Sequence, residues 1–119
     1  GAGGTQRLPR LIGIGKAKEL IFSAKRISAE EATAIGLLEY AVPRAQVLEQ
    51  ALEIAKTMVK NAPLALIQAK VAINKGIETD LSTGLKIEEL AYNALVCTED
   101  RLEGLRAFVE KRPPQYKGK

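Results

Sequence analysis

The stretch GAGGTQRLPRLIG, Gly1 to Gly13, places three glycines in its first four residues. Glycines at the start of a helix leave backbone amides open at the positive end of the helix dipole, where they can hold an anion, an oxyanion or a water. A Walker loop needs Lys and then Ser or Thr where this chain has Thr5-Gln6. A dinucleotide-binding loop needs its last glycine where this chain has Gln6. The stretch therefore fits neither loop. The stretch is therefore interpreted as an amide-donating loop or a structural turn.

A second candidate is the segment TEDRLEGLRAFVEKRP, residues 98–113. Phe108 and Lys111 are three residues apart, so on a helix an aromatic ring and an ammonium group project from one face. The ring could pack against a ligand while the lysine meets a phosphate. The structural alternative is a core phenylalanine beside a solvated lysine.

The carboxylates do not suggest a general acid and base pair. Residues 30–31 fit the first turn of a helix, and residues 88–89 point different ways on theirs. Asp100 and Glu103 lie near the start of another helix, where the helix dipole favours negative charge. None of these residues is assigned to catalysis.

Histidine is absent, and Cys97 is the one cysteine. This composition excludes an internal disulfide, a Cys/His zinc site and Ser-His-Asp or Cys-His catalysis. Cys97 is expected to be a small buried residue, and we expect no metal site and no bound cofactor.

The hydrophobic periodicity predicts a mainly α fold with one short strand near 37–42, which would lack a partner. Residues 1–43 are expected to form one region and residues 44–119 a second, helical one. Ser28, Asp80 and Thr98 are expected to cap helices. Helices are expected at residues 16–24, 28–36, 48–59, 63–75, 81–95 and 99–112.

The helix at Pro63–Lys75 is apolar nearly all round and is expected to be deeply buried, with Gly76 as its C-cap. The next helix contains Gly84 in its interior. Large apolar faces on the helices around Leu48 and Leu66 are expected to drive association into oligomers.

A chain of 119 residues with 46% hydrophobic and 27% charged residues has the composition of one small globular domain. The net charge of +4 is dispersed along the chain, which is typical of a solvated surface and disfavours nucleic-acid binding. No apolar run approaches the roughly 20 residues that span a bilayer. The sequence therefore predicts an intracellular protein without a membrane span.

Taken together, GAGGTQRLPR, KAKELIFSAKRISAEEATAIGL, PLALIQAKVAINKGIETDL and EDRLEGLRAFVEKRPP resemble the crotonase superfamily of enoyl-CoA hydratases and isomerases. They are most similar to the short-chain enoyl-CoA hydratases and the AU-binding methylglutaconyl-CoA hydratase group. The resemblance extends over residues 1–119 and implies the C-terminal helical part of a crotonase α/β fold.

The resemblance implies a lyase of acyl-CoA degradation that adds water to a trans-2-enoyl-CoA. Its two catalytic glutamates would belong to a preceding spiral half, so the 119-residue chain alone is expected to be inactive. Gly1 matches a glycine whose amide helps to hold the catalytic water. Phe108 and Lys111 match a pair that encloses the CoA part of the substrate, which is a coenzyme A thioester rather than a cofactor.

The family further implies a homotrimer or hexamer, in the bacterial cytoplasm or the mitochondrial matrix. No residue pattern here supports the RNA binding known in the AU-binding branch. Two alternatives stay open: a non-catalytic helical assembly or acyl-CoA-binding module and, less favoured, a basic helical nucleic-acid binder.

Overall fold

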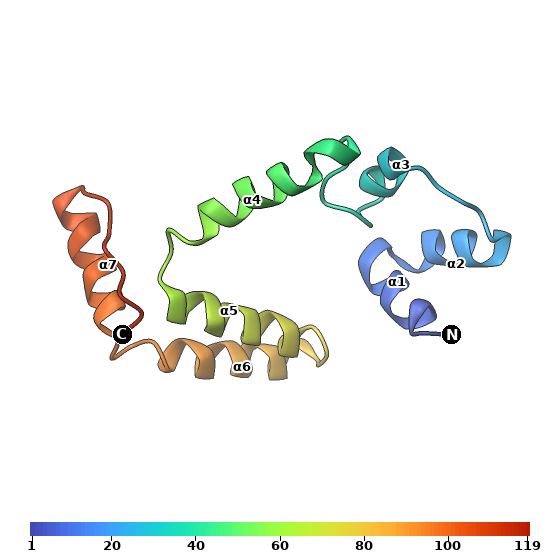
Figure 1. Ribbon diagram of the computed structural model, residues 1–119. Coiled ribbons are helices and arrows are strands. Elements are labelled where there is room, and N and C mark those ends of the chain that lie inside the picture. Colours follow the sequence, from blue (N-terminus) through green and yellow to red (C-terminus); the bar gives the residue numbers. More distant parts are fainter. The chain divides into compact units, whose positions relative to one another are not determined.

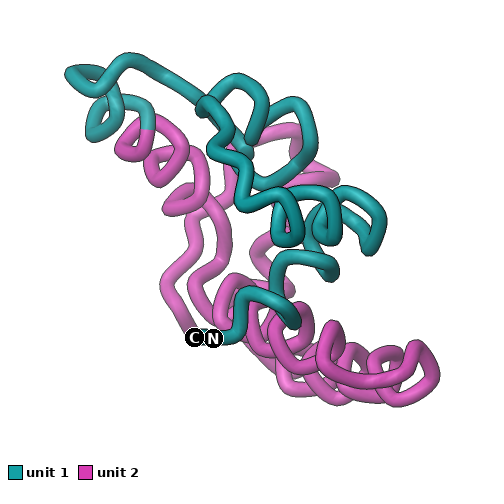
Figure 2. Tube along the Cα trace, turned by 90° about the vertical axis from the view of Figure 1, so that its right-hand side faces the viewer, with its two compact units in different colours: residues 1–50 teal, residues 51–119 magenta.

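A computed structural model describes residues 1–119. The chain is helical and divides into two compact units, residues 1–50 and residues 51–119, which Figure 2 colours separately. None of its helices combines the length and the apolar character needed to cross a membrane. The helices are α1 (Gly4–Ile12), α2 (Ile14–Ser23), α3 (Ala29–Ala34), a 3-10 turn η1 (Arg44–Gln46), α4 (Val47–Met58), α5 (Pro63–Gly76), α6 (Leu81–Asn93) and α7 (Glu99–Glu110) (Figure 1).

In the first unit, α1 packs on α2 across a sharp turn at Gly13. Gly13 has a φ of 83°, a conformation that side chains other than hydrogen disfavour. Its amide donates to the Pro9 carbonyl at 3.1 Å, and its carbonyl accepts from Ala17 N at 3.1 Å. The glycine thus ends one helix and begins the next without a connecting loop.

The caps expected from the sequence are present. Ser28 Oγ accepts from the Glu31 amide at 3.1 Å, Asp80 Oδ1 from the Thr83 amide at 3.1 Å, and Thr98 Oγ1 from the Arg101 amide at 3.3 Å. In a capping box, the carboxylate of Glu31 would in return accept a hydrogen bond from the Ser28 amide. Here that carboxylate instead pairs with Lys25 Nζ at 2.6 Å.

The strand predicted near 37–42 is wrong. Residues 37–42 form an irregular connection between α3 and η1, and the amides of Leu37 and Leu38 both donate to the Ala32 carbonyl. The chain contains no strand, so this segment has no neighbour with which it could form the hydrogen bonds of a sheet.

Helices α5 and α6 lie side by side and are joined by the short turn after Gly76 (Figure 1). Gly76 is not the expected C-cap, because it is the last residue of α5 and the C-cap is Ile77, with a helical φ of −64°. Instead Gly76 faces Gly84: a Cβ on Gly84 would lie 3.4 Å from the Gly76 oxygen and 3.6 Å from its Cα. The absence of side chains at both positions lets the two backbones approach closely.

The expectation that α5 is deeply buried is also wrong for this chain. Ile67 and Ile73 are 56% and 69% exposed, because α6 covers only one stripe of a helix that is apolar nearly all round. The buried apolar residues of the chain are all small, namely Ala17, Ala32, Ala91 and Ala107. Cys97, expected to be buried, is exposed.

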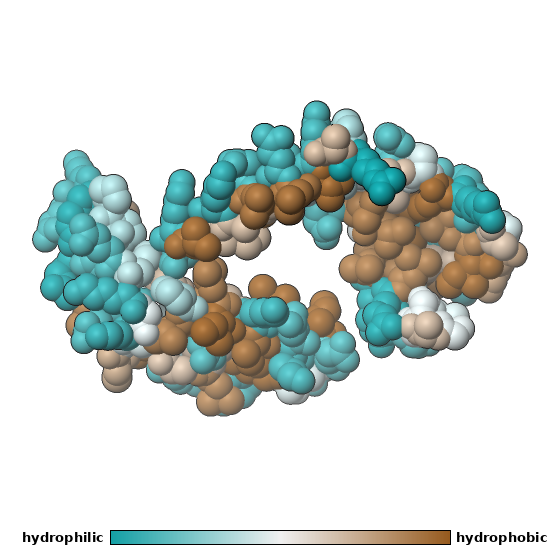
Figure 3. Space-filling view, viewed as in Figure 1, coloured by the Kyte–Doolittle hydropathy of each residue, from teal (hydrophilic) through white to brown (hydrophobic).

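Helix α4 shows the same excess of apolar surface. Leu48, Leu52 and Val59 are exposed along one stripe, and Figure 3 shows apolar residues on one side of α4 and hydrophilic residues on the other. An apolar stripe of this kind ordinarily faces a protein core or a partner.

The close approach of Gly76 and Gly84 gives a stability prediction. Gly84→Leu should destabilise the chain by about 1–3 kcal/mol, because the larger side chain pushes the two helices apart. Gly84→Ala should be neutral or stabilising by up to about 1 kcal/mol, since its Cβ makes only ordinary contact and alanine favours the helix. Urea unfolding followed by circular dichroism measures both. Equal stability of the two variants would show that the glycine contact does not set the helix spacing.

Candidate functional site

The turn at residues 1–3 precedes α1 and is exposed at Gly1. Its carbonyls are occupied: Gly1 O accepts from Gly4 N at 3.2 Å, Gly3 O accepts from Arg7 N at 2.9 Å, and the Arg7 guanidinium donates to Ala2 O. The amides of Ala2 and Gly3 have no acceptor in the chain. The turn therefore has the free amides of an amide-donating loop, and the assignment of Gly1 to that role stays a prediction.

Both residues of the second candidate lie at the C-terminal end of α7. Phe108 is 85% exposed, so it is not the core phenylalanine of the structural alternative. Lys111 is exposed and forms no ion pair, and its amide donates to the Phe108 carbonyl at 3.3 Å. The structure thus places both residues at the end of α7 in the second unit, while Gly1 belongs to the first.

Lys111 ends α7 in a left-handed conformation, with a φ of 53°. A residue with a Cβ adopts this conformation at a cost of roughly 1–2 kcal/mol, so neighbouring contacts must hold it there. The Arg112 amide donates to the Ala107 carbonyl at 3.1 Å, which closes the helix end around Lys111. The next residues supply the further contacts.

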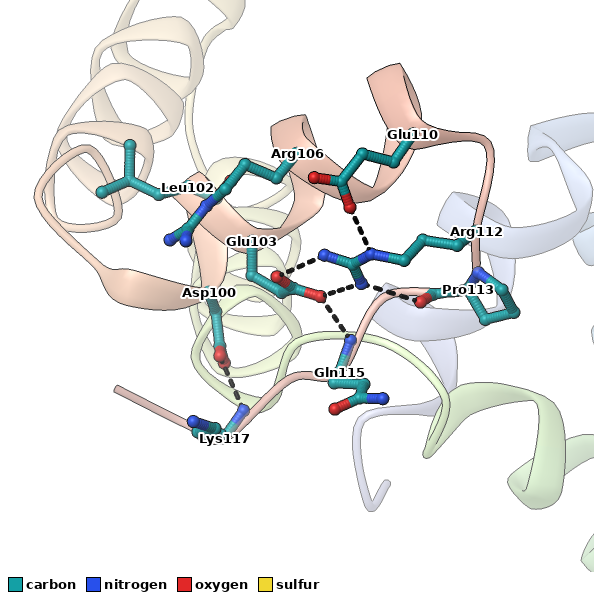
Figure 4. Close-up of polar contacts among 9 residues, drawn as sticks. All are labelled: Asp100, Leu102, Glu103, Arg106, Glu110, Arg112, Pro113, Gln115 and Lys117. Carbon is teal, nitrogen blue, oxygen red and sulfur yellow. Dashed lines mark hydrogen bonds and ion pairs between the residues drawn. The ribbon is translucent and has the colours of Figure 1, made fainter.

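Arg112 is the centre of a polar network that the sequence analysis did not identify (Figure 4). Its guanidinium binds both oxygens of Glu103, from Nη1 at 2.6 Å and from Nη2 at 3.1 Å. Its Nε donates to Glu110, and Nη1 also donates to the Pro113 carbonyl at 3.2 Å. The Gln115 amide completes the network by donating to Glu103 Oε1 at 2.8 Å.

The same network shifts the acidity of Glu103. The hydrogen bonds from Arg112, followed by that from the Gln115 amide, lower the pKa of Glu103 to about 2. The carboxylates of Glu103 and Glu110 in turn raise the pKa of Arg112. Both members of the fork therefore stay charged throughout the neutral range.

A second carboxylate holds the chain end. Asp100, only 3% exposed, accepts from the amides of Lys117 at 2.6 Å and Gly118 at 2.8 Å, and its own amide donates to the Lys119 carbonyl at 3.0 Å. The basic C-terminal segment therefore runs back along α7 (Figure 1). The position of Asp100 near the start of a helix predicts only a favourable interaction with the helix dipole, and the contact with the chain end depends on the chain reversal.

The returning segment also contributes Tyr116 to the lining of an open pocket of 360 Å³ that is otherwise lined by residues of α5, α6, α7 and the α6–α7 connection. Tyr116 lies on Gly104, where a Cβ would come within 3.2 Å of the tyrosine hydroxyl oxygen. A glycine inside α7 together with the two prolines just after it was the available signal that the chain reverses and packs on this helix.

The pKa of Glu103 gives a pH prediction. Because that pKa lies below the ordinary value of 4.5, the stabilisation from this carboxylate is complete above about pH 4.5 and is lost as the pH falls through about 2. The amide resonance of Gln115, followed by NMR, should therefore titrate with a midpoint near 2. The Glu103→Gln variant should show no such titration, and a midpoint near 4.5 in the unmodified chain would contradict the ion pair.

Comparison with known proteins identifies the family. The sequence profile of the family described as enoyl-CoA hydratase/isomerase matches residues 1–119. YngF of Bacillus subtilis, which its name assigns to enoyl-CoA hydratases and isomerases, is 56% identical over 118 residues, covering 99% of this chain and 45% of that protein. The mouse mitochondrial methylglutaconyl-CoA hydratase is 52% identical over 122 residues, covering 99% of this chain and 39% of its own.

Solved structures agree with the sequence match. An enoyl-CoA hydratase from Bacillus anthracis superimposes with a TM-score of 0.92 at 57% identity, over 100% of this chain and 46% of that one. The chain thus spans less than half the length of each of these proteins. With a family profile matched along its whole length and relatives above 50% identity, this chain belongs to the enoyl-CoA hydratase/isomerase family.

Proposed function

We propose that this chain is the helical C-terminal part of an enoyl-CoA hydratase, a lyase that adds water to a trans-2-enoyl-CoA. The observation that carries the proposal is the exposed Phe108 beside the unpaired Lys111, at a helix end braced by an ion-pair network. Family membership and relatives named as enoyl-CoA and methylglutaconyl-CoA hydratases support the reaction class.

In this proposal the two residues bind the CoA part of the substrate. The Lys111 ammonium meets a phosphate of CoA, and the Phe108 ring packs against the ligand beside it. The amide at Gly1 helps to hold the water that is added. The carboxylates that activate this water are supplied by a part of the enzyme outside these 119 residues, and no cofactor beyond the thioester substrate is required.

The exposed apolar faces of α4 and α5 support a partner surface. We propose that they are covered in a homotrimer, or in a hexamer of two trimers, together with the rest of the enzyme. The bacterial and mitochondrial names of the relatives support a site of action in the bacterial cytoplasm or the mitochondrial matrix. The same faces also favour a second candidate, a non-catalytic helical assembly or acyl-CoA-binding module.

The first prediction from this proposal distinguishes a part of an enoyl-CoA hydratase from a non-catalytic assembly or acyl-CoA-binding module. The 119-residue chain alone should not hydrate crotonyl-CoA above background, because in this proposal the carboxylates that activate the water lie in another part of the enzyme. A chimera in which this chain replaces the matching segment of the Bacillus anthracis enoyl-CoA hydratase should hydrate it. Absorbance loss of the conjugated thioester measures both. Turnover by the chain alone, or an inactive but folded chimera, would contradict the proposal.

The second prediction concerns Lys111. In the chimera, Lys111→Asn removes the ammonium while keeping a residue type that tolerates the left-handed conformation. The KM for crotonyl-CoA should rise about tenfold with little change in kcat, as expected for a lost charge-assisted contact to a phosphate. The crotonyl thioester of pantetheine, which lacks the nucleotide part of CoA, should be unaffected.

Lys60→Asn is the matched control, because Lys60 is an exposed lysine outside any ion pair and is not part of α7. It should leave both KM values unchanged. Equal effects of the two substitutions on crotonyl-CoA would mean that Lys111 contributes only general positive charge.

A further inference from the structure

The conformation of Lys111 is not set by helix α7 alone. The residue that follows it, Arg112, is fixed at three points by Glu103, Glu110 and the Pro113 carbonyl. Because Arg112 is bonded directly to Lys111 in the chain, these side-chain contacts add to the bond from the Arg112 amide to the Ala107 carbonyl, which closes the helix end. A left-handed non-glycine residue persists where surrounding contacts over-determine it, as they do here.

Glu103 is the group on which these contacts converge. It lies two turns before Lys111 on the same helix and binds both the Arg112 guanidinium and the Gln115 amide, which flank the two prolines. Figure 4 shows its carboxylate pointing from α7 into the bend formed by residues 112–115. One side chain therefore ties both ends of this bend to the helix.

The contact between Glu103 and Arg112 fixes the relative orientation of the two side chains as well as pairing their charges. A guanidinium fork on a carboxylate fixes direction as well as distance, which an ammonium cannot do. The Glu103 side chain is only 17% exposed, whereas the ion pairs of α2, α4 and α6 have exposures between 39% and 67%. It is thus the most sheltered carboxylate among the ion pairs of the chain.

We infer that Glu103, acting through Arg112, is a positioning residue that holds Lys111 and Phe108 in the orientation that meets the CoA nucleotide. This inference rests on the proposed function. Glu103 itself does not touch the substrate. Its contribution is to present the Lys111 ammonium in a fixed direction, so that binding does not have to order the helix end first.

The direction in which the KM for crotonyl-CoA changes in Glu103→Gln distinguishes a positioning role of Glu103 from a purely electrostatic one. CoA is anionic, so removing a negative charge from α7 should by itself strengthen binding. A loss of positioning should weaken it. In the chimera, Glu103→Gln is therefore expected to raise the KM for crotonyl-CoA about fivefold, with little change in kcat and no change for the pantetheine thioester. Arg112→Lys should behave in the same way, because lysine cannot form the fork.

Glu99→Gln is the matched control, since it removes the same charge from the same helix at a carboxylate outside any ion pair. It should leave the KM for crotonyl-CoA unchanged or lower it slightly. The double variant Glu103→Gln/Lys111→Asn completes a cycle. If Glu103 acts through Lys111, the double variant should have the KM of Lys111→Asn alone.

Three results would overturn the inference: an unchanged or lowered KM in Glu103→Gln, an equal rise for both thioesters, or full additivity in the double variant. An equal rise would indicate general damage to the fold. The proposed function fails separately, because its test is Lys111→Asn: if that variant raises the KM while Glu103→Gln does not, the CoA contact stands and only the positioning role is wrong.

Discussion

Small side chains set the distances at which the helices of this chain pack. The buried apolar residues are all alanines, and Gly76 and Gly84 bring the backbones of α5 and α6 almost into contact. The close approach of two helices gives many contacts between their backbones, but it buries little of the surface of the large apolar side chains. The leucines, isoleucines and valines of α4 and α5 consequently stay exposed. This surplus of apolar surface is what the proposed assembly would cover.

Where the apolar core is thin, charged groups define the local structure. Asp100 and Glu103, one helical turn apart on α7, bind the chain that returns after Pro113-Pro114. Asp100 takes two successive amides near the chain end, and Glu103 takes the Arg112 guanidinium and the Gln115 amide. The C-terminal segment is thereby part of the α7 unit: Asp100 binds it near the start of the helix, and Glu103 binds the bend that follows Lys111.

In the proposed function, this segment binds the thioester and another part of the enzyme activates the water. Binding and positioning of the thioester are separable from activation of the water, and interactions with remote parts of a substrate can be used to orient its reacting part. An exposed aromatic ring and an ammonium on a braced helix end suit the first task. The family match covers the whole chain, so Phe108 and Lys111 lie in a segment that belongs to the enoyl-CoA hydratase/isomerase family.

The sequence by itself determined the local features. Capping by Ser28, Asp80 and Thr98 and the amphipathic helices follow from residue types at short spacing. The family followed from several such motifs in order. The errors arose where the outcome depends on distant residues: residues 37–42 have strand-like character but no partner strand, and α5 is apolar but has one neighbour.

Only the tertiary structure decided the contacts between residues that are far apart or that depend on a chain reversal. Glu103 meets Arg112 nine residues later and Asp100 meets Gly118 eighteen residues later, because the chain turns back after the prolines. Helical periodicity describes neighbours three or four residues apart and says nothing about such pairs. The left-handed conformation of Lys111 could not be predicted from the sequence for the same reason. Contacts of the residues that follow stabilise it, and not a preference of lysine for this conformation.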